Sequence, residues 1–258
     1  MGAELEFRVR WVSETGSTNA DLLAAAMLGE EAGAVLVADH QRAGRGRRGR
    51  SWLAAPKAGL LFSVLIRPNL TPENAPLITT ALALGAVDAC DQLAGVRPGV
   101  KWPNDLVIGE RKLAGVLAES LLVEGRLEAV VAGMGINVRA GAAPPDITAA
   151  SVSLDEAAAR DKRDGPKSPI DRRELLAATL DRFSMWLAGI DAAEGRAALM
   201  GAARRESATL GQRVAVELDH GVLEGEAVEL DDTGALLVAD GSARHRVTVG
   251  DVVHSRRA

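Results

Sequence analysis

Glycine and arginine alternate in one short segment, residues 41–52, with the sequence QRAGRGRRGRSW. Its glycines, Gly44, Gly46 and Gly49, allow positive φ angles and let the backbone approach a ligand closely. Arginine stays protonated and presents a planar fork of donors that matches a carboxylate or a phosphate. The segment carries five arginines: Arg42, Arg45, Arg47, Arg48 and Arg50. We therefore predict a loop that closes over a small anion.

Three interpretations of this loop compete. The glycine spacing fits a dinucleotide-binding fingerprint by letter, but that motif must open a helix, and Pro56 would interrupt a helix soon after Gly49. A solvated Gly/Arg segment that binds nucleic acid usually comes as a longer repeat or in a basic chain, whereas this is a single copy in an acidic chain. The third interpretation is a loop that becomes ordered over a nucleotide and an acid substrate.

A second polar constellation is KWPNDL, residues 101–106. A lysine at a strand end is a point charge that can meet a carboxylate or a phosphate, and Pro103 restricts Trp102 to extended geometry. Taken alone, this segment is better explained as a plain turn after an edge strand. It is followed by KLAGVLAE at 112–119 and by GMGIN at 133–137, where glycines again bring the backbone close to another group.

Composition bounds the class of protein. The chain has 258 residues, 47% of them hydrophobic, a net charge of −5 and a pI of about 5.5. An acidic chain has no global attraction for nucleic acid or an anionic membrane, so the positive charge is local. The single cysteine, Cys90, excludes a disulfide framework within the chain, and its apolar surroundings predict a buried thiol. We see neither an N-terminal signal core nor an apolar run of spanning length, and expect a cytoplasmic protein.

The elements that must position these motifs follow from hydrophobic periodicity. Strands are expected at 7–12, 34–38, 60–66, 100–102 and 106–108, with a hairpin of 112–120 and 127–137 that turns at Glu124 and Gly125. Helices are expected at 20–28, 72–93, about 168–188 and 192–205. Thr18 with Asp21 fits a capping box for the first helix, and Ser168 before Pro169 predicts the start of the third.

The pattern changes near residue 207. Five short strands are expected at 213–218, 223–231, 235–239, 243–249 and 252–256, with turns rich in glycine and aspartate. Short strands at regular spacing with such turns are typical of a small barrel. We therefore predict two units, a catalytic domain at 1–206 and a β-barrel at 207–258.

The motifs together resemble those of the biotin–protein ligases. The matching pieces are STN at 17–19, QRAGRGRRGRSW at 41–52, KWPNDL at 101–106, KLAGVLAE at 112–119 and GMGIN at 133–137, in the family's order and at about its spacings. The resemblance covers essentially the whole chain. It implies an α+β fold, with a mixed sheet and helices on one face like a class II synthetase, followed by a small SH3-like barrel.

The resemblance also implies a two-step reaction. Biotin and ATP with Mg²⁺ give biotinyl-5′-AMP and pyrophosphate, and a lysine in the biotin carboxyl carrier domain of an acetyl-CoA or acyl-CoA carboxylase then takes the biotin. Joining two anions requires charge neutralisation and positioning, which arginines, a lysine and Mg²⁺ can supply without a nucleophilic side chain.

By family position, the residues divide between the two substrates. Those expected to bind biotin are Ser17, Thr18, Asn19, Gln41, Gly44, Arg45, Lys101, Gly115, Gly133 and Gly135. Those expected to bind the nucleotide are Arg47, Arg48, Arg50, Trp52, Lys112 and Asn137, with Trp52 packed on the adenine. Lys101, Arg45 and Arg47 are expected to be catalytic, with Lys101 bridging the biotin carboxyl and the α-phosphate. No residues are assigned to Mg²⁺.

Alternatives remain within the resemblance. Some family members carry an N-terminal helix-turn-helix and act as repressors, but here the first motif begins at Ser17, so we expect no repressor function, no specific DNA binding and no membrane partner. A lipoate or octanoyl transferase shares a related fold, and a non-catalytic biotin-binding relative would keep it. The arginine loop and KWPND favour the biotin ligase.

Overall fold

The structure is a computed structural model of the chain. It describes residues 5–144, 148–161, 169–218, 221–248 and 250–254. The polar loop expected at 161–167 and the helix-start residue Ser168 lie outside these ranges, apart from Asp161.

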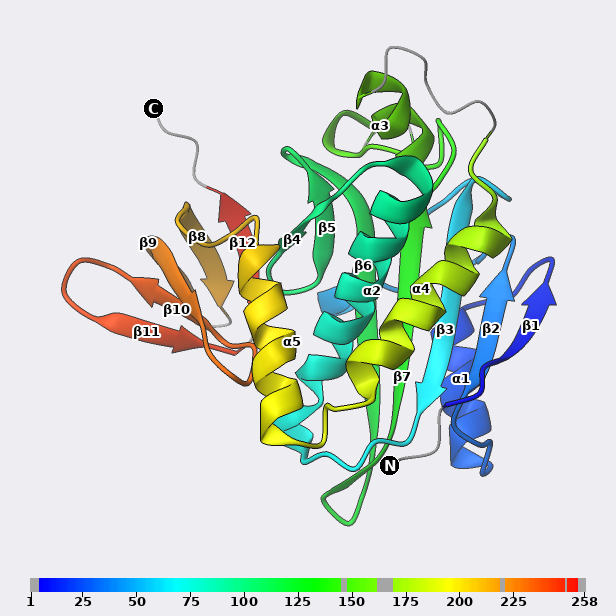
Figure 1. The fold of residues 1–258 in the computed structure, drawn as a ribbon, viewed down its shortest axis with the longest axis horizontal. Helices are drawn as coiled ribbons and strands as arrows, with labels where there is room; N and C mark the ends of the chain where they lie inside the picture. The colour runs from blue at the N-terminus through cyan, green and yellow to red at the C-terminus, as the bar shows by residue number, and fades with distance from the viewer. Residues whose placement is uncertain (1–4, 145–147, 162–168, 219–220, 249, 255–258) are drawn as a thin grey trace.

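A seven-stranded sheet forms the centre of the larger part of the chain (Figure 1). Its strands are β1 (Arg8–Val12), β2 (Ala34–Ala38), β3 (Gly59–Ile66), β4 (Gly99–Lys101), β5 (Asp105–Ile108), β6 (Arg111–Val123) and β7 (Arg126–Asn137). They are ordered β1-β2-β3-β7-β6-β5-β4. β1 and β2 are parallel and all other neighbours are antiparallel, so the expected mixed sheet is confirmed.

The strands follow their sequence patterns. Every residue of β2 and β3 is buried, as expected for continuous apolar runs covered on both faces. β6 and β7 form the expected hairpin, and its turn has two positive φ angles, 51° at Glu124 and 76° at Gly125. Two consecutive positive φ angles match the right-handed twist of a tight hairpin.

Helices cover both faces of this sheet. They are α1 (Thr18–Met27), α2 (Pro76–Ala94), α3 (Leu154–Asp161), α4 (Arg172–Leu187) and α5 (Ala193–Arg205). In Figure 1, α2 and α4 lie in front of the sheet and α1 behind it. Alternation along β2 agrees, because Val35 and Val37 join the core under α2 while Leu36 packs with Leu22 of α1. The expectation of helices on one face holds for α2 and α4, and α1 adds a helix on the opposite face. Helix α3 had no counterpart among the expected elements.

Two predicted helix starts are wrong. The N-cap of α1 is Ser17, whose side chain accepts from the Ala20 N–H, and not Thr18. Thr18 bonds to Gln41 instead, and Asp21 accepts a hydrogen bond from Thr15, so no capping box forms. Helix α4 begins at Arg172, with Asp171 as its N-cap. Both errors have one cause: several adjacent residues can cap a helix, and tertiary contacts select among them.

A second sheet follows α5. Its strands are β8 (Arg213–Leu218), β9 (Gly221–Leu230), β10 (Leu236–Ala239), β11 (Arg244–Val247) and β12 (Asp251–His254), all antiparallel, in the order β11-β10-β9-β8-β12. These five strands confirm the sequence expectation, and we call this unit the barrel. Its buried valines, Val214 and Val216 among them, belong to the same core cluster as α2.

The two units are hydrogen-bonded where they join. The Val100 N–H donates to Glu206 O at 2.7 Å, and the Ala208 N–H donates to Val100 O at 2.9 Å. The chain thus crosses from α5 into the barrel along the edge strand β4. The division at 206/207 remains a proposal.

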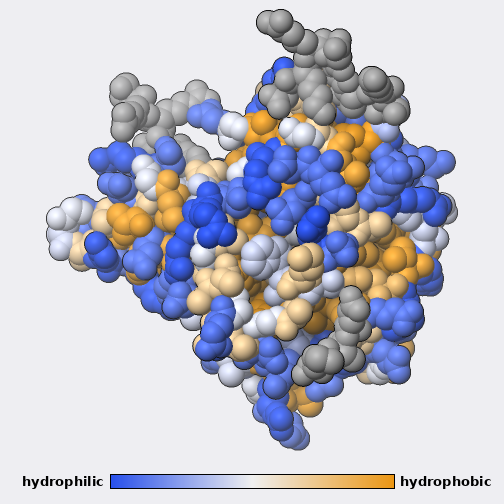
Figure 2. Space-filling model, viewed as in Figure 1, coloured by the Kyte–Doolittle hydropathy of each residue, from blue (hydrophilic) through white to orange (hydrophobic). Residues whose placement is uncertain are grey.

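Helix α2 is the central core helix. Residues 72–94 are long and apolar enough to cross a membrane, contrary to the sequence expectation, but 67% of the relevant window is buried inside the protein, as in a core helix. Cys90 on this helix is fully buried, as expected, and burial raises the pKa of its thiol to about 12. Figure 2 shows hydrophilic side chains spread among smaller apolar areas on the face that carries α2 and α4.

Candidate active site

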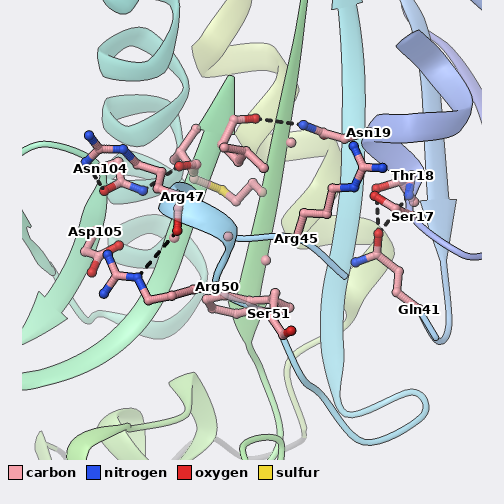
Figure 3. Close-up of a pocket in the computed structure, with 18 of the residues that line it drawn as sticks. Ser17, Thr18, Asn19, Gln41, Arg45, Arg47, Arg50, Ser51, Asn104 and Asp105 are labelled. Carbon is pink, nitrogen blue, oxygen red and sulfur yellow. Dashed lines mark hydrogen bonds between the residues drawn. The ribbon is translucent and has the colours of Figure 1, made fainter. Parts of the chain in front are cut away.

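A cavity of about 700 Å³, including its open mouth, lies where the arginine loop meets the sheet and the start of α1 (Figure 3). Most of the residues predicted to bind ligands line it: Ser17, Thr18, Asn19, Gln41, Arg45, Arg47, Arg50, Trp52, Lys112, Gly115, Gly133 and Gly135. The tertiary structure thus brings together motifs that are separated by more than one hundred residues in the sequence.

The start of α1 forms one wall. Ser17, Thr18 and Asn19 are buried, although all three are polar. Gln41 is fixed there, because its Oε1 accepts from the Thr18 N–H at 2.8 Å and from Thr18 Oγ1 at 3.1 Å. The first N–H groups of a helix carry partial positive charge and favour electron-rich ligand atoms.

Asn19 is held by a buried polar network. Its Nδ2 donates to Leu117 O at 3.0 Å and to Glu119 Oε2 at 2.8 Å, while its Oδ1 lies 2.5 Å from Ser63 Oγ. Gly133 makes room for this arrangement, since a Cβ atom there would lie 2.0 Å from Asn19 Oδ1. A buried asparagine with all its groups engaged is rigid, because any rotation would leave a polar atom unpaired.

The arginine loop is folded back on itself. The Trp52 N–H donates to Gly44 O at 2.9 Å, and the Gly46 N–H donates to Arg50 O at 2.7 Å. The only helical piece is the short turn η1 (Arg47–Gly49), in which Arg48 has a φ of 52°. Since no α-helix begins directly after Gly49, the dinucleotide fingerprint is not formed, in agreement with the sequence interpretation.

Trp52 lies across the floor of the cavity. Its indole faces the glycines of β6 and β7, and a Cβ atom on Gly115 would lie 3.2 Å from its Cζ3. Lys112 Nζ is 5.4 Å from the ring centroid and 2.7 Å from Asp105 Oδ1. The buried Trp52 Nε1 has no hydrogen-bond partner within the described part of the chain.

The turn after β4 borders the same cavity. Asn104 and Asp105 line it, and Asn104 Nδ2 donates to Val116 O at 2.6 Å. Lys101 is half-buried just before this turn and is not among the lining residues. Burial lowers the pKa of the Lys101 ammonium, and the nearby carboxylate of Asp105 opposes that shift.

Four predicted site residues lie outside the cavity lining: Gly44, Arg48, Lys101 and Asn137. Arg48 Nη1 donates to Glu217 O in the barrel at 3.0 Å. Asn137 Nδ2 donates to Lys112 O and Val152 O at 3.4 Å each. Gly44 packs against the Trp52 carbonyl, where a Cβ atom would lie 2.4 Å from the oxygen. Gly44 and Asn137 thus support Trp52 and Lys112, which do line the cavity.

Sequence reasoning did not assign several residues that line or support the cavity: Gly46, Ser51, Phe62, Ser63, Asn104, Asp105, Val116, Leu117, Glu119 and Met134. Ser63 carried a usable signal, because it is the one hydroxyl in the otherwise apolar strand GLLFSVLI. A polar residue in the middle of a buried strand must find a partner, which here is the start of α1.

Comparison with known proteins agrees with this geometry. Residues 14–137 match the model of the biotin/lipoate A/B protein ligase family, and residues 209–255 match the biotin protein ligase C-terminal domain. A biotin–[acetyl-CoA-carboxylase] ligase of Mycobacterium tuberculosis is 39% identical over 251 residues, which cover 95% of this chain and 88% of the relative. One of Paracoccus denitrificans is 32% identical over 93% of this chain and 98% of the relative.

Solved structures agree as well. The biotin protein ligase of Aquifex aeolicus in complex with biotin and ATP superposes with a TM-score of 0.79 at 28% identity, covering 97% of this chain and 99% of that one. The match spans the sheet, its helices and the barrel. On the evidence of both family models, of relatives matched over nearly their whole length and of this superposition, the chain belongs to the biotin–protein ligase family.

Proposed function

We propose that the cavity beside α1 is where this ligase joins biotin to ATP and retains the product. The enzyme is an ATP-dependent ligase that forms biotinyl-5′-AMP and transfers biotin to a lysine of a carboxylase's biotin carrier. The observation that carries the proposal is the convergence of four cations, Arg45, Arg47, Arg50 and Lys112, on one cavity that also holds the start of α1.

The two ends of the cavity suit the two substrates. Ser17, Thr18 and Asn19 offer buried hydroxyl and amide groups, and Gln41 adds a half-buried amide. Such groups suit a neutral, hydrogen-bonding ring such as the ureido ring of biotin. The loop arginines, Lys112 and the indole of Trp52 suit phosphates and a purine. Lys101 pairs with Asp105, which lines the cavity, and we assign Lys101 to the junction of the two substrates.

The chemistry requires no nucleophilic side chain. A carboxylate oxygen of biotin attacks the α-phosphorus, the bond to the β-phosphate breaks, and pyrophosphate leaves. The amine of the carrier lysine then attacks the acyl carbon, loses a proton, and AMP leaves. The first step brings two anions together, and the second develops negative charge on the acyl oxygen and on the departing phosphate. Fixed cations in a partly dry cavity therefore stabilise the transition states more than the separated substrates.

Mg²⁺ accompanies ATP in this reaction. Within the described ranges no three His, Cys, Asp or Glu side chains come together as a metal site. Asp105 is the one carboxylate lining the cavity among the residues described, and Lys112 already pairs with it. Mg²⁺ commonly binds through substrate phosphates, one or two carboxylates and water. We propose that the ion enters with the triphosphate, with Asp105 as the available protein oxygen ligand.

The carrier, the compartment and the absence of other partners are further parts of the proposal. The acceptor is the biotin carboxyl carrier domain of an acetyl-CoA or acyl-CoA carboxylase. We propose a cytoplasmic enzyme without specific DNA or membrane binding, in keeping with its net charge of −5.

Mass spectrometry of a carrier domain tests the proposal. The domain is incubated with the enzyme, ATP and either biotin or lipoate, with a carrier lysine-to-arginine variant as control. We expect a mass gain equal to one biotinyl group that depends on ATP and on the lysine. A gain with lipoate only would establish the acyltransferase alternative. Pyrophosphate release is measured in parallel, and its absence together with biotin binding would identify a non-catalytic relative.

A further inference from the structure

The arginine loop is attached to the barrel, about two hundred residues away in sequence. Arg50 Nη2 lies 2.5 Å from Asp251 Oδ2, and Arg47 Nη1 lies 3.7 Å from Asp251 Oδ1. Arg47 Nη1 also donates to Gly250 O at 3.3 Å. Three arginines of the loop therefore contact the barrel, because Arg48 donates to Glu217 O as described above.

Asp251 is placed so that its two carboxylate oxygens face different arginines. Its side chain is 18% exposed and that of Arg47 is 20% exposed, whereas that of Arg50 is 64% exposed. A carboxylate at this depth is costly unless it is paired. The position of Asp251 thus favours the loop conformation that brings both guanidinium groups to it. Burial lowers the pKa of Arg47, and Asp251 and Asp105 oppose that shift, so the guanidinium stays charged.

The barrel can act as a rigid support because it is fixed to the body beside the same site. Trp102 Nε1 donates to Gly234 O at 2.9 Å, and the Trp102 N–H donates to Thr209 Oγ1 at 2.9 Å. Gly250 lies so close to β8 that a Cβ atom would be 2.6 Å from Val216 Cγ1. This close approach sets where the Gly250 carbonyl meets Arg47.

Arg47 joins all three parts of the site. Besides its barrel contacts it donates to Asn104 Oδ1 at 3.3 Å, and Asn104 belongs to the turn that lines the cavity (Figure 3). Arg47 and Arg50 also line the cavity themselves. Two residues at the cavity are therefore held by groups of the barrel, Asp251 and, for Arg47, also the Gly250 carbonyl.

We propose that Asp251 is a positioning residue for adenylate formation, which holds Arg47 and Arg50 at the cavity so that the barrel sets the conformation of the loop. This inference rests on the proposed function. Asp251 acts through the two arginines and does not itself touch the substrates. A loop that is already held in place binds phosphates without the full entropic cost of ordering, so losing the anchor weakens ATP binding more than biotin binding.

The test compares Asp251→Asn with Asp251→Glu and with a matched control in the same barrel. The control is Asp232→Asn, which makes the same change at an ion pair with Arg204 where the carboxylate is 78% exposed. Folding is checked by circular dichroism and melting temperature. The measurements are KM for ATP in biotin-dependent pyrophosphate exchange, Kd for biotin by calorimetry, and the rate of tryptic cleavage within residues 45–50.

For Asp251→Asn we expect a KM for ATP raised roughly tenfold, a biotin Kd within about twofold of wild type, and faster cleavage of the loop. Asp251→Glu should recover much of the ATP affinity, and Asp232→Asn should behave as wild type. Unchanged KM and unchanged cleavage in a folded Asp251→Asn overturn the proposal. A lowered KM for ATP also overturns it, because Asp251 would then compete with phosphate for the arginines. An equal loss of affinity for ATP and for biotin overturns it as well.

Two further outcomes are decisive. If Asp251→Asn does not fold, Asp251→Ala carries the test with the same expected results, and a folded Asp251→Ala with wild-type KM and wild-type cleavage overturns the proposal. If the wild-type enzyme shows no pyrophosphate exchange, the proposed function fails, yet the cleavage rates still show whether Asp251 holds the loop.

Discussion

Trp52 packs directly on Gly135 of β7, where a Cβ atom would lie 2.4 Å from Trp52 Cε2. Gly133, two residues earlier on the same face, makes the corresponding room for Asn19. The glycines of GMGIN, expected to bring the backbone near a ligand, thus bring it near two of the chain's own cavity side chains. Their role in direct biotin contact stays a prediction.

Replacing Gly135 by alanine should displace the Trp52 indole, because the ring lies directly against the β7 backbone and leaves no space for a methyl group. We expect KM for ATP to rise several-fold and stability to fall by about 1–3 kcal/mol, the usual cost of overpacking. The control is Gly201→Ala in α5, where the nearest atom to a new Cβ is the end of Arg205 at 3.6 Å. Wild-type kinetics in Gly135→Ala would contradict the assigned packing.

Trp52→Ala should weaken ATP binding more than biotin binding. Stacking of a base on an aromatic ring contributes roughly 1–3 kcal/mol in nucleic-acid complexes, which we use as a guide for the adenine. KM for ATP and Kd for biotin are measured on the same folded variant. Equal losses for both substrates would mean that Trp52 supports the cavity as a whole and does not contact the nucleotide.

Lys101→Ala should lower the rate of adenylate formation by about 10- to 150-fold, equivalent to losing one charge-assisted contact worth roughly 1.5–3 kcal/mol. The variant should fold, because Lys101 is only half-buried and borders the site. Single-turnover pyrophosphate release measures the effect. Near-normal release by a folded variant would reject the proposed bridging role.

The pKa of Lys101 predicts an alkaline limit on activity. The Lys101 ammonium must be charged to act, and burial lowers its pKa from the model-compound value of 10.5. As the pH is raised, activity should therefore begin to decline before pH 10.5 is reached, because the proton is lost. Between the lowered pKa of the folded state and 10.5, the unfolded chain still binds this proton while the folded chain has lost it. In that pH range Lys101 therefore makes the free energy of unfolding rise with pH. The rate is measured against pH for wild type and Lys101→Arg. In the arginine variant we expect the decline in rate at high pH to move to higher pH. If the decline does not move, it belongs to the titration of another group.

Ser63→Ala should weaken biotin binding. Ser63 Oγ is fully buried, 2.7 Å from Thr18 Oγ1 and 2.5 Å from Asn19 Oδ1. Its loss leaves the buried Asn19 Oδ1 without its partner, at a cost of about 1–3 kcal/mol. Thr179→Val is a control, since Thr179 Oγ1 is buried in α4 and bonds to Leu175 O. Calorimetry should show weaker biotin binding for Ser63→Ala only. Equally weakened biotin binding in both variants would mean that the effect comes from a general loss of stability and not from the site.

The arrangement of the barrel changes how its role can be tested. Its valines share a core cluster with α2, and Trp102 bonds to it through both main chain and side chain. A truncation near Glu206 would expose part of that core, so we expect it to fold poorly. Point substitutions at the contact between loop and barrel separate function from stability more cleanly.

The sequence alone determined the strands of the large sheet, the β6–β7 hairpin, the five barrel strands and the family, because apolar periodicity and turn residues act over short distances and the motifs are specific. Tertiary structure decided the rest. It selected Ser17 over Thr18 as the N-cap, because Thr18 is held by Gln41 from another strand end. It also placed α1 on the opposite face of the sheet, where Asn19 meets Ser63 and Glu119. Arg50 and Asp251 are 201 residues apart, and no local pattern pairs them. Only the packing of the barrel against the body brings that carboxylate to the arginine loop, because a contact between distant residues depends on the positions of every element between them.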